Sequence, residues 1–81
     1  FGQLTVCFPH SAIMPQRNLS ELIRQHGIAA SNPSYSTKEN GQVFEYVLTL
    51  PTRDRENYRR LAESFSGMPQ IREFSITPTG D

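Results

Sequence analysis

The sequence predicts one small α+β domain in which a four-stranded antiparallel sheet carries two helices on one face. Three observations predict this fold. The chain has 81 residues, enough for one hydrophobic core. Two segments show the apolar periodicity of amphipathic helices, and four others alternate or lie between turn signals as strands do. Their order, βαββαβ, arranges two strand–helix–strand halves with right-handed crossovers into a ferredoxin-like sandwich.

Two strands are apolar enough to lie at the centre of the sheet. Gln42–Leu50 alternates along its length, and Leu4–Phe8 alternates until Pro9, which cannot donate to a ladder. On the core face of the longer strand we expect Phe44, Tyr46, Leu48 and Leu50. The other face of that strand carries Val43, Glu45, Val47 and Thr49.

The other two strands are expected at the edges of the sheet. Ala29–Thr37 is rich in serine and contains a proline, which an edge strand tolerates. The Asn-Gly pair in Lys38–Gly41 is a strong hairpin signal and joins this segment to the central strand that follows. Gln70–Thr77 is the last strand, with Phe74 and Ile76 on its core face.

The first helix has two possible starts. Pro15 suits a first helical position, and Asn18 with Glu21 three residues later resembles a capping box. Gly27 is expected to end this helix in the left-handed conformation. The apolar stripe of the helix consists of Leu19, Leu22 and Ile23.

The second helix is expected to be capped by Thr52 or Asp54 and to end at Gly67. Its apolar stripe consists of Tyr58, Leu61, Ala62 and Phe65. The helices and strands together predict a core of Leu4, Val6, Phe8, Leu22, Ile23, Phe44, Tyr46, Leu48, Leu61, Phe65, Phe74 and Ile76.

Composition and pattern argue against several kinds of partner. Lys and Arg number eight, as do Asp and Glu, so the formal net charge is zero and no nucleic-acid partner is expected. The aromatics Phe8, Phe44 and Tyr46 fall on the core face, where they cannot stack on bases. No apolar run approaches the ~18 residues of a membrane span. Because the chain begins at Phe1, we interpret it as a fragment that contacts a membrane only through segments before it.

The residues that could carry chemistry are few and scattered. Cys7 is the single cysteine, which rules out an intrachain disulfide. Cys7 and His10 could be two ligands of a soft metal and His26 a third, but each also suits a structural role, which we favour. The loop Pro9–Gln16 has no glycine or arginine to hold a phosphate, and no nucleophile–base pair is evident. We therefore expect no metal, no cofactor and no catalysis.

An arginine cluster at the start of the second helix consists of Arg53, Arg55, Arg59 and Arg60. These side chains could contact an anion or a phospholipid headgroup. Alternatively, they form a solvated helix face whose charge is balanced by Asp54, Glu56 and Glu63, and we favour this interpretation.

The sheet face opposite the helices is expected to be open. Val43, Val47 and Ile71 are apolar residues that the strand alternation predicts on this face. They suggest self-association or a protein partner, although scattered surface hydrophobes are an equally good interpretation.

A βαββαβ domain with an open sheet face and no enzymatic site resembles ACT domains, small regulatory modules that bind amino acids and dimerise. The ligand loop of these domains carries a glycine near the start of the first helix, whereas the corresponding Ser11–Pro15 has none. The resemblance implies that a small molecule would bind near His10 and Ser11, at the edge of the first helix.

The C-terminal stretch Ile71–Asp81 is similar to the end of some bacterial inner-membrane proteins of the MgtC/SapB type, in which a cytosolic ACT-like domain follows a membrane domain. The resemblance implies that residues 1–81 are one ACT-like domain of a longer protein, on the cytosolic face of the inner membrane. It also implies a link to magnesium homeostasis. We predict a non-catalytic regulatory or interaction domain; the alternative is an amino-acid-sensing ACT domain of a metabolic enzyme or transporter.

Overall fold

The computed structural model describes residues 1–79 and contains the predicted βαββαβ order. A short 3₁₀ helix, η1, follows the first strand. The elements are β1 (Gly2–Pro9), η1 (His10–Ala12), α1 (Gln16–Arg24), β2 (Ser31–Lys38), β3 (Val43–Leu50), α2 (Arg55–Ser66) and β4 (Glu73–Pro78).

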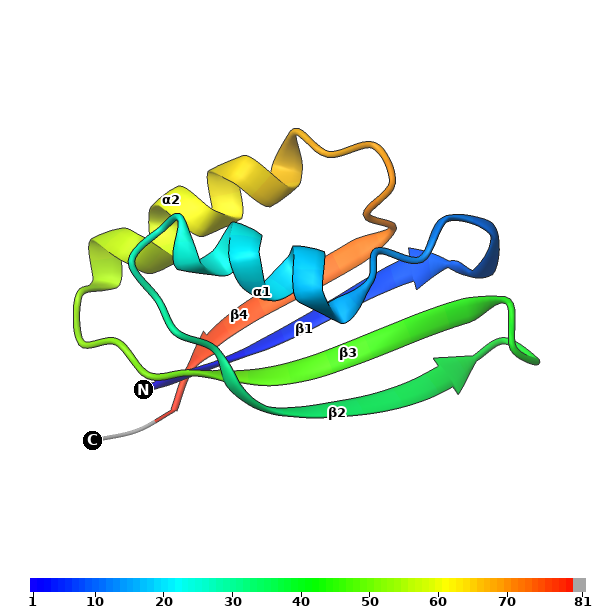
Figure 1. Ribbon diagram of the computed structural model, residues 1–81, viewed down its shortest axis with the longest axis horizontal. Coiled ribbons are helices and arrows are strands. Elements are labelled where there is room, and N and C mark those ends of the chain that lie inside the picture. Colours follow the sequence, from blue (N-terminus) through cyan, green and yellow to red (C-terminus); the bar gives the residue numbers. More distant parts are fainter. Residues whose placement is uncertain (80–81) are drawn as a thin grey trace.

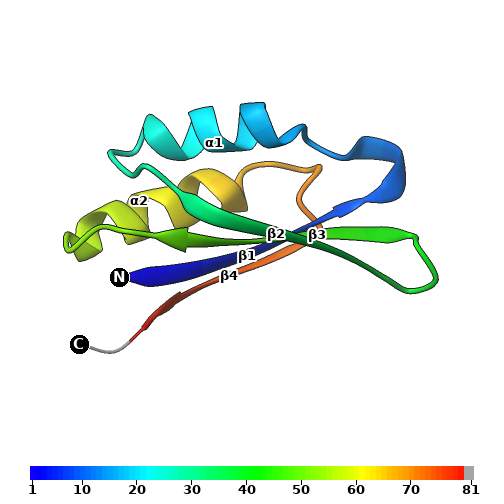
Figure 2. The same cartoon turned by 60° about the horizontal axis from the view of Figure 1, so that its bottom comes forward.

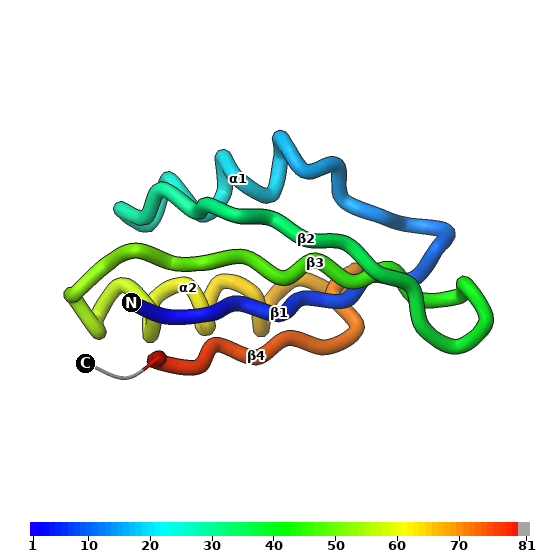
Figure 3. Tube along the Cα trace, turned by 90° about the horizontal axis from the view of Figure 1, so that it is seen from below, coloured from blue at the N-terminus to red at the C-terminus, as the bar shows by residue number. Residues whose placement is uncertain are grey.

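The four strands form one antiparallel sheet in the order β2-β3-β1-β4. The two apolar strands, β1 and β3, are therefore central, and β2 and β4 are edges, as predicted. Both helices lie on one side of the sheet, and no helix covers the other side (Figures 1 and 2). Figure 3, seen from below, shows the strands in this order with α2 behind them. This arrangement is a ferredoxin-like, ACT-like sandwich.

The core lies between the sheet and the helices, and the strand register builds its sheet side. Leu4 pairs with Leu48 on β3 and with Ile76 on β4, so one face presents apolar side chains from three neighbouring strands. The helices close this face with Leu19 and Ile23 of α1 and with the apolar stripe of α2.

The core differs in part from the predicted one. Leu22, Phe44, Phe74 and Ile76 are only partly buried. On α1 the pair four residues apart, Leu19 and Ile23, faces the sheet, which leaves Leu22 at the margin. Phe74 and Ile76 belong to an edge strand, where one side lacks a neighbouring strand. The predicted core list left out four buried residues, Leu19, Ile28, Leu50 and Tyr58, although the sequence patterns assign three of these, Leu19, Leu50 and Tyr58, to the apolar faces of their elements.

The helix ends test the capping predictions. Pro15 directly precedes α1, and the predicted capping box is wrong, because Asn18 is already inside the helix and Glu21 pairs with Arg24 instead. Gly27 has the predicted left-handed conformation, with φ of +80°.

The start of α2 confirms a predicted N-cap, whereas the end of α2 at Gly67 differs in conformation from a typical glycine C-cap. The Asp54 carboxylate accepts a hydrogen bond of 2.9 Å from the backbone N–H of Glu56, as expected of an N-cap. Gly67 ends the helix with φ of −91°, a value open to any residue, so no left-handed conformation requires a glycine there.

The β2–β3 hairpin confirms the turn that the Asn-Gly pair predicted. Glu39, Asn40 and Gly41 all have positive φ, at 52°, 57° and 84°, as tight hairpin connections need. The turn fixes the register of the two strands, in which Lys38 pairs with Val43.

Candidate functional site

One face of the sheet is not covered by a helix (Figure 2), and the strand registers assign alternate residues of all four strands to it. In the register, Cys7 of β1 lies between Glu45 of β3 and Glu73 of β4, and Ser36 of β2 lies beside Glu45 on its other side. Five other positions on this face hold small hydroxyl residues, namely Thr5, Ser34, Thr49, Ser75 and Thr77.

Glu45 is the centre of a polar network on this face. The residue is only 9% exposed, although no helix lies above it. Its carboxylate accepts hydrogen bonds from Ser36 Oγ at 3.0 Å and Cys7 Sγ at 3.6 Å, and it forms an ion pair of 2.9 Å with Lys38 Nζ. Every polar contact of this carboxylate therefore comes from a neighbouring strand or the same hairpin. We call Cys7, Ser36, Lys38 and Glu45 the Glu45 network.

The network shifts the pKa of three of its members, and the hydrogen bond with Glu45 raises that of Lys38. The hydrogen bond from Lys38 lowers the pKa of Glu45 and outweighs the burial that would raise it. Burial raises the pKa of the Cys7 thiol, and the neighbouring Glu45 carboxylate raises it further. Near neutral pH the face therefore holds a carboxylate and a protonated thiol, and the thiol is a poor nucleophile.

Sequence reasoning did not find this network, although a signal for it existed. The Asn-Gly turn fixes which residues of β2 and β3 face each other. Counting back from the Lys38–Val43 pair places Ser36 opposite Glu45. The contribution of Cys7 needs the β1–β3 register, which no local pattern specifies.

The three predicted partner-face residues have different environments. Val43 is only 3% exposed, and Val47 is partly buried. Ile71 is not on the open face: it precedes β4, which begins at Glu73 and not at Gln70, and it packs against the core on the helix side. The open face is consequently more polar than predicted, with Val47 as its accessible apolar residue.

The predicted ligand residues His10 and Ser11 lie in η1, at the end of the sheet where the β2–β3 turn also lies (Figure 1). The backbone N–H of His10 donates to Gln42 O at 2.8 Å, which holds η1 against the hairpin. Both residues line a hollow of about 360 Å³ together with Arg72, which sequence reasoning did not single out. The Arg72 N–H donates to Cys7 O at 2.9 Å, and this bond fixes the backbone before β4.

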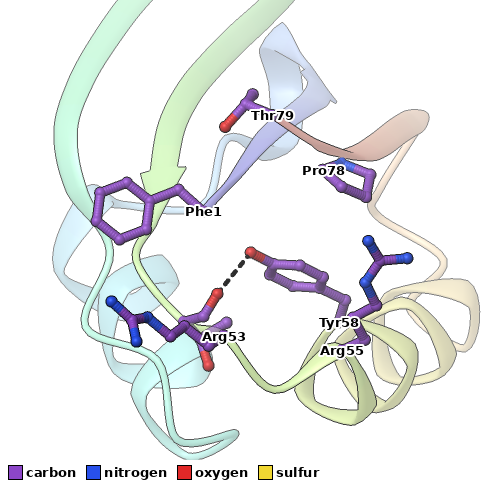
Figure 4. Close-up of a pocket in the computed structure, with 7 residues that line it drawn as sticks. Phe1, Arg53, Arg55, Tyr58, Pro78 and Thr79 are labelled. Atoms are coloured by element: carbon purple, nitrogen blue, oxygen red, sulfur yellow. Dashed lines mark hydrogen bonds between the residues drawn. The ribbon is translucent and has the colours of Figure 1, made fainter. Parts of the chain in front are cut away.

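A larger hollow, of about 800 Å³, lies at the opposite end of the sheet, between the β3–α2 connection and the end of β4 (Figure 4). Tyr58 lies across it. The Tyr58 hydroxyl is 3.0 Å from Thr52 O and 3.2 Å from Leu50 O, so the phenol is held by the end of β3. The remaining lining residues are Phe1, Arg53, Arg55, Pro78 and Thr79.

The arginine cluster divides into two pairs. Arg59 forms ion pairs with Glu56 and Glu63, and Arg60 donates to Asn57, in agreement with the predicted solvated helix face. Within residues 1–79, by contrast, Arg53 and Arg55 form no ion pair, and both line the larger hollow.

The hypothetical metal ligands take other roles. His26 Nδ1 is 3.0 Å from Leu22 O, at the end of α1, and Cys7 belongs to the Glu45 network. The described part of the chain contains no group of three or more His, Cys, Asp or Glu residues placed to hold a metal ion.

No helix within residues 1–79 is long and apolar enough to cross a membrane.

Comparison with known proteins supports the fold. No family model matches the sequence. No curated protein matches it either. The structure is similar to that of a formyltetrahydrofolate deformylase from Pseudomonas putida KT2440, with a TM-score of 0.65 and 12% identity over 96% of this chain. The chain spans only 28% of the length of that enzyme chain. At this identity the match shows an ACT-like fold, and it does not support the resemblance to MgtC/SapB proteins.

Proposed function

We propose that this chain is a non-catalytic regulatory module that acts by self-association, with a second copy docking on the open face of the sheet. The observation that carries the proposal is the Glu45 network, in which a glutamate residue only 9% exposed lies on a central strand of a sheet face without helices. A charge is rarely held out of water on an exposed face unless its partners are fixed.

The network gives the open face an ordered cluster of polar groups near the β2–β3 turn. Glu45 already has its partners within its own copy, so docking over it would not leave an unsatisfied charge. It lies on a central strand, with β1 and β2 on its two sides, which restricts its side-chain freedom before any partner arrives. Pre-ordered groups lose less conformational entropy on binding, which favours association.

A second copy fits this face because the charges are self-complementary. A two-fold interface brings the same patch of both copies together, so the patch must match itself. Each copy offers the Lys38 ammonium beside the Glu45 carboxylate, and the Lys38 side chain remains 56% exposed. Under a two-fold axis, the lysine of each copy can approach the carboxylate of the other.

Sedimentation velocity on a pair of surface variants tests the proposal. Ser75 is exposed on the open face, opposite Thr5, whereas Ser66 is exposed at the end of α2. Ser75→Arg places a long cation on the face and is expected to weaken association at least about tenfold, an effect of ~1.4 kcal/mol. Ser66→Arg makes the same chemical change on the helix side and is expected to have no effect. Equal association of the two variants would contradict the proposal.

A second candidate is favoured by the hollow at His10 and Ser11, where Arg72 from the far end of the sequence joins them. There the domain would sense a small molecule such as an amino acid, whose carboxylate Arg72 could pair with. A thermal-shift screen with the common amino acids would show a rise in melting temperature by mass action. Arg72→Gln should abolish that rise, and a rise that persists in this variant would rule out this hollow as the site.

The larger protein to which this domain belongs remains a proposal. The placement with MgtC/SapB inner-membrane proteins and magnesium homeostasis is supported by the order of elements and by the stretch Ile71–Asp81, of which Gly80 and Asp81 lie outside the described residues. The sequence upstream of Phe1 in the parent protein tests it. Several apolar spans are expected there. A catalytic domain in their place would contradict the placement with MgtC/SapB proteins and would support a role in enzyme regulation.

A further inference from the structure

The hollow beside Tyr58 is used by neither proposed function, and it combines positive charge with apolar walls. Figure 4 shows Tyr58 across its middle, with Arg55 and Pro78 on one side of the ring and Phe1 and Arg53 on the other. The two arginines thus lie at opposite ends of the Tyr58 side chain, and the Arg53 guanidinium extends past its hydroxyl end towards Phe1 (Figure 4).

The positive charge at this hollow is not neutralised within the described residues. Arg53 and Arg55 have no ion-pair partner in residues 1–79. Asp54 lies between them in sequence, but its carboxylate accepts from the backbone N–H of Glu56 and so caps α2. The neighbouring arginines further along the helix, Arg59 and Arg60, are engaged with other side chains.

Thr52 is a polar residue in the lining of the same hollow. Its Oγ1 accepts from the backbone N–H of Asp54 at 3.2 Å and from the amide of Asn57 at 3.3 Å. These two contacts hold Thr52 against the start of α2, where it forms part of the wall of the hollow.

The remaining walls are apolar. Phe1 is 64% exposed, one of the two large hydrophobic side chains most exposed on the described molecule. Pro78 lies across the hollow from it, and the Tyr58 ring lies between them (Figure 4). A ligand with an aromatic or aliphatic group can cover this surface and remove it from water.

We propose that this hollow binds a small organic oxyanion, a carboxylate or phosphate ester that also carries an apolar group. Arg53 and Arg55 would supply the positive charge that attracts the oxyanion, and the planar donor fork of either guanidinium matches carboxylate and phosphate. The apolar group would lie against Phe1, Tyr58 and Pro78. The site is distinct from the Glu45 network and from the His10 hollow. A negative result in the binding test of this hollow can therefore be distinguished from a negative result in the tests of the proposed functions.

Titration of the full chain with four probes tests this site. Phenyl phosphate and benzoate combine an oxyanion with an aromatic ring, whereas inorganic phosphate and phenol each supply one part only. Binding is followed by calorimetry and by the NMR signals of the Tyr58 ring. We expect saturable binding of phenyl phosphate or benzoate, tighter than that of either single-part probe. The tighter of the two aromatic anions identifies the ligand as a phosphate ester or as a carboxylate.

Charge-matched variants make the test specific to this hollow. The double variant Arg53→Gln, Arg55→Gln removes the proposed pairing groups and is expected to weaken binding at least about tenfold. The control double variant Arg17→Gln, Arg24→Gln removes two exposed arginines of α1, outside the hollow, and is expected to leave binding within about twofold. Undiminished binding in the double variant, an equal loss in the control, or no saturable binding of either aromatic anion would overturn the proposal.

Discussion

Replacing Gly2 with alanine is expected to destabilise the domain, because β1 passes directly against the Tyr58 ring. A Cβ atom at position 2 would lie 2.7 Å from Tyr58 Oη and 2.8 Å from Cζ, well inside van der Waals contact. The ring cannot withdraw freely, since its hydroxyl is held by the carbonyls of Leu50 and Thr52. Gly2 cannot withdraw either, because it pairs with Leu50 on one side and Pro78 on the other.

The size of the effect follows from these contacts. Overpacking a well-filled site typically destabilises by about 1–3 kcal/mol. Displacement of the phenol would also lose a hydrogen bond worth about 1 kcal/mol. We expect a loss of about 2–3 kcal/mol in the free energy of unfolding. For a domain of this size that lowers the melting temperature by about 10–20 °C.

Urea and thermal unfolding, followed by circular dichroism, measure this loss, and a second glycine provides the control. A Cβ on Gly67 would meet only Ser64 O, at 3.7 Å, and its φ of −91° suits alanine. Gly67→Ala should therefore be neutral or slightly stabilising. The double variant Gly2→Ala, Tyr58→Phe should lose less than the sum of the single variants, because a ring without its hydroxyl is free to move. If Gly2→Ala were as stable as Gly67→Ala, the reasoning about this contact would be refuted.

Three further predictions concern the helix ends and the open face. Asp54→Ala should lower the free energy of unfolding by about 1 kcal/mol in urea titrations, because the N-cap of α2 is lost, whereas Asp54→Asn should retain most of it. Gly27→Ala should destabilise by about 1–2 kcal/mol, because φ is +80° there and the new methyl would approach Asn57 Nδ2 to 3.3 Å; stability equal to the parent would contradict this. The folded-state pKa of Glu45 is lowered, so its contribution to stability is present above the unfolded-state pKa of about 4.3 and is lost as pH falls through the folded value. The difference in unfolding free energy between the parent and Glu45→Gln should thus shrink on acidification, and a constant difference would show that Lys38 does not hold the carboxylate.

Most of the fold was predictable because local patterns specify it. The alternation in β3, the apolar stripes of the helices and the Asn-Gly turn each predict one element, and the central position of β1 and β3 follows from how apolar they are. The start of β4 was misplaced because Gln70–Arg72 has no pattern that separates a strand from the loop before it. That error alone moved Ile71 onto the wrong face.

The candidate sites were less predictable because they join residues distant in sequence. Tyr58 was recognised as part of an apolar stripe, but its hollow exists only because Phe1 and Pro78 meet the start of α2. In the sequence, Arg53 and Arg55 belong to one arginine cluster with Arg59 and Arg60. The ion pairs of Arg59 and the hydrogen bond from Arg60 to Asn57, seen only in the structure, separate the two pairs. Sequence periodicity reports which face a side chain takes, and it does not report which other segment lies there.

Isotope-filtered NMR on a mixture of labelled and unlabelled chains tests the central claim, self-association through the open face, most directly. Cross-peaks between different copies report which side chains meet. The account predicts intermolecular contacts from the Val47 and Thr5 methyl groups and from the Lys38 side chain, all of which lie on the open face. Absence of cross-peaks between copies at millimolar concentration, or contacts confined to α1 and α2, would contradict it.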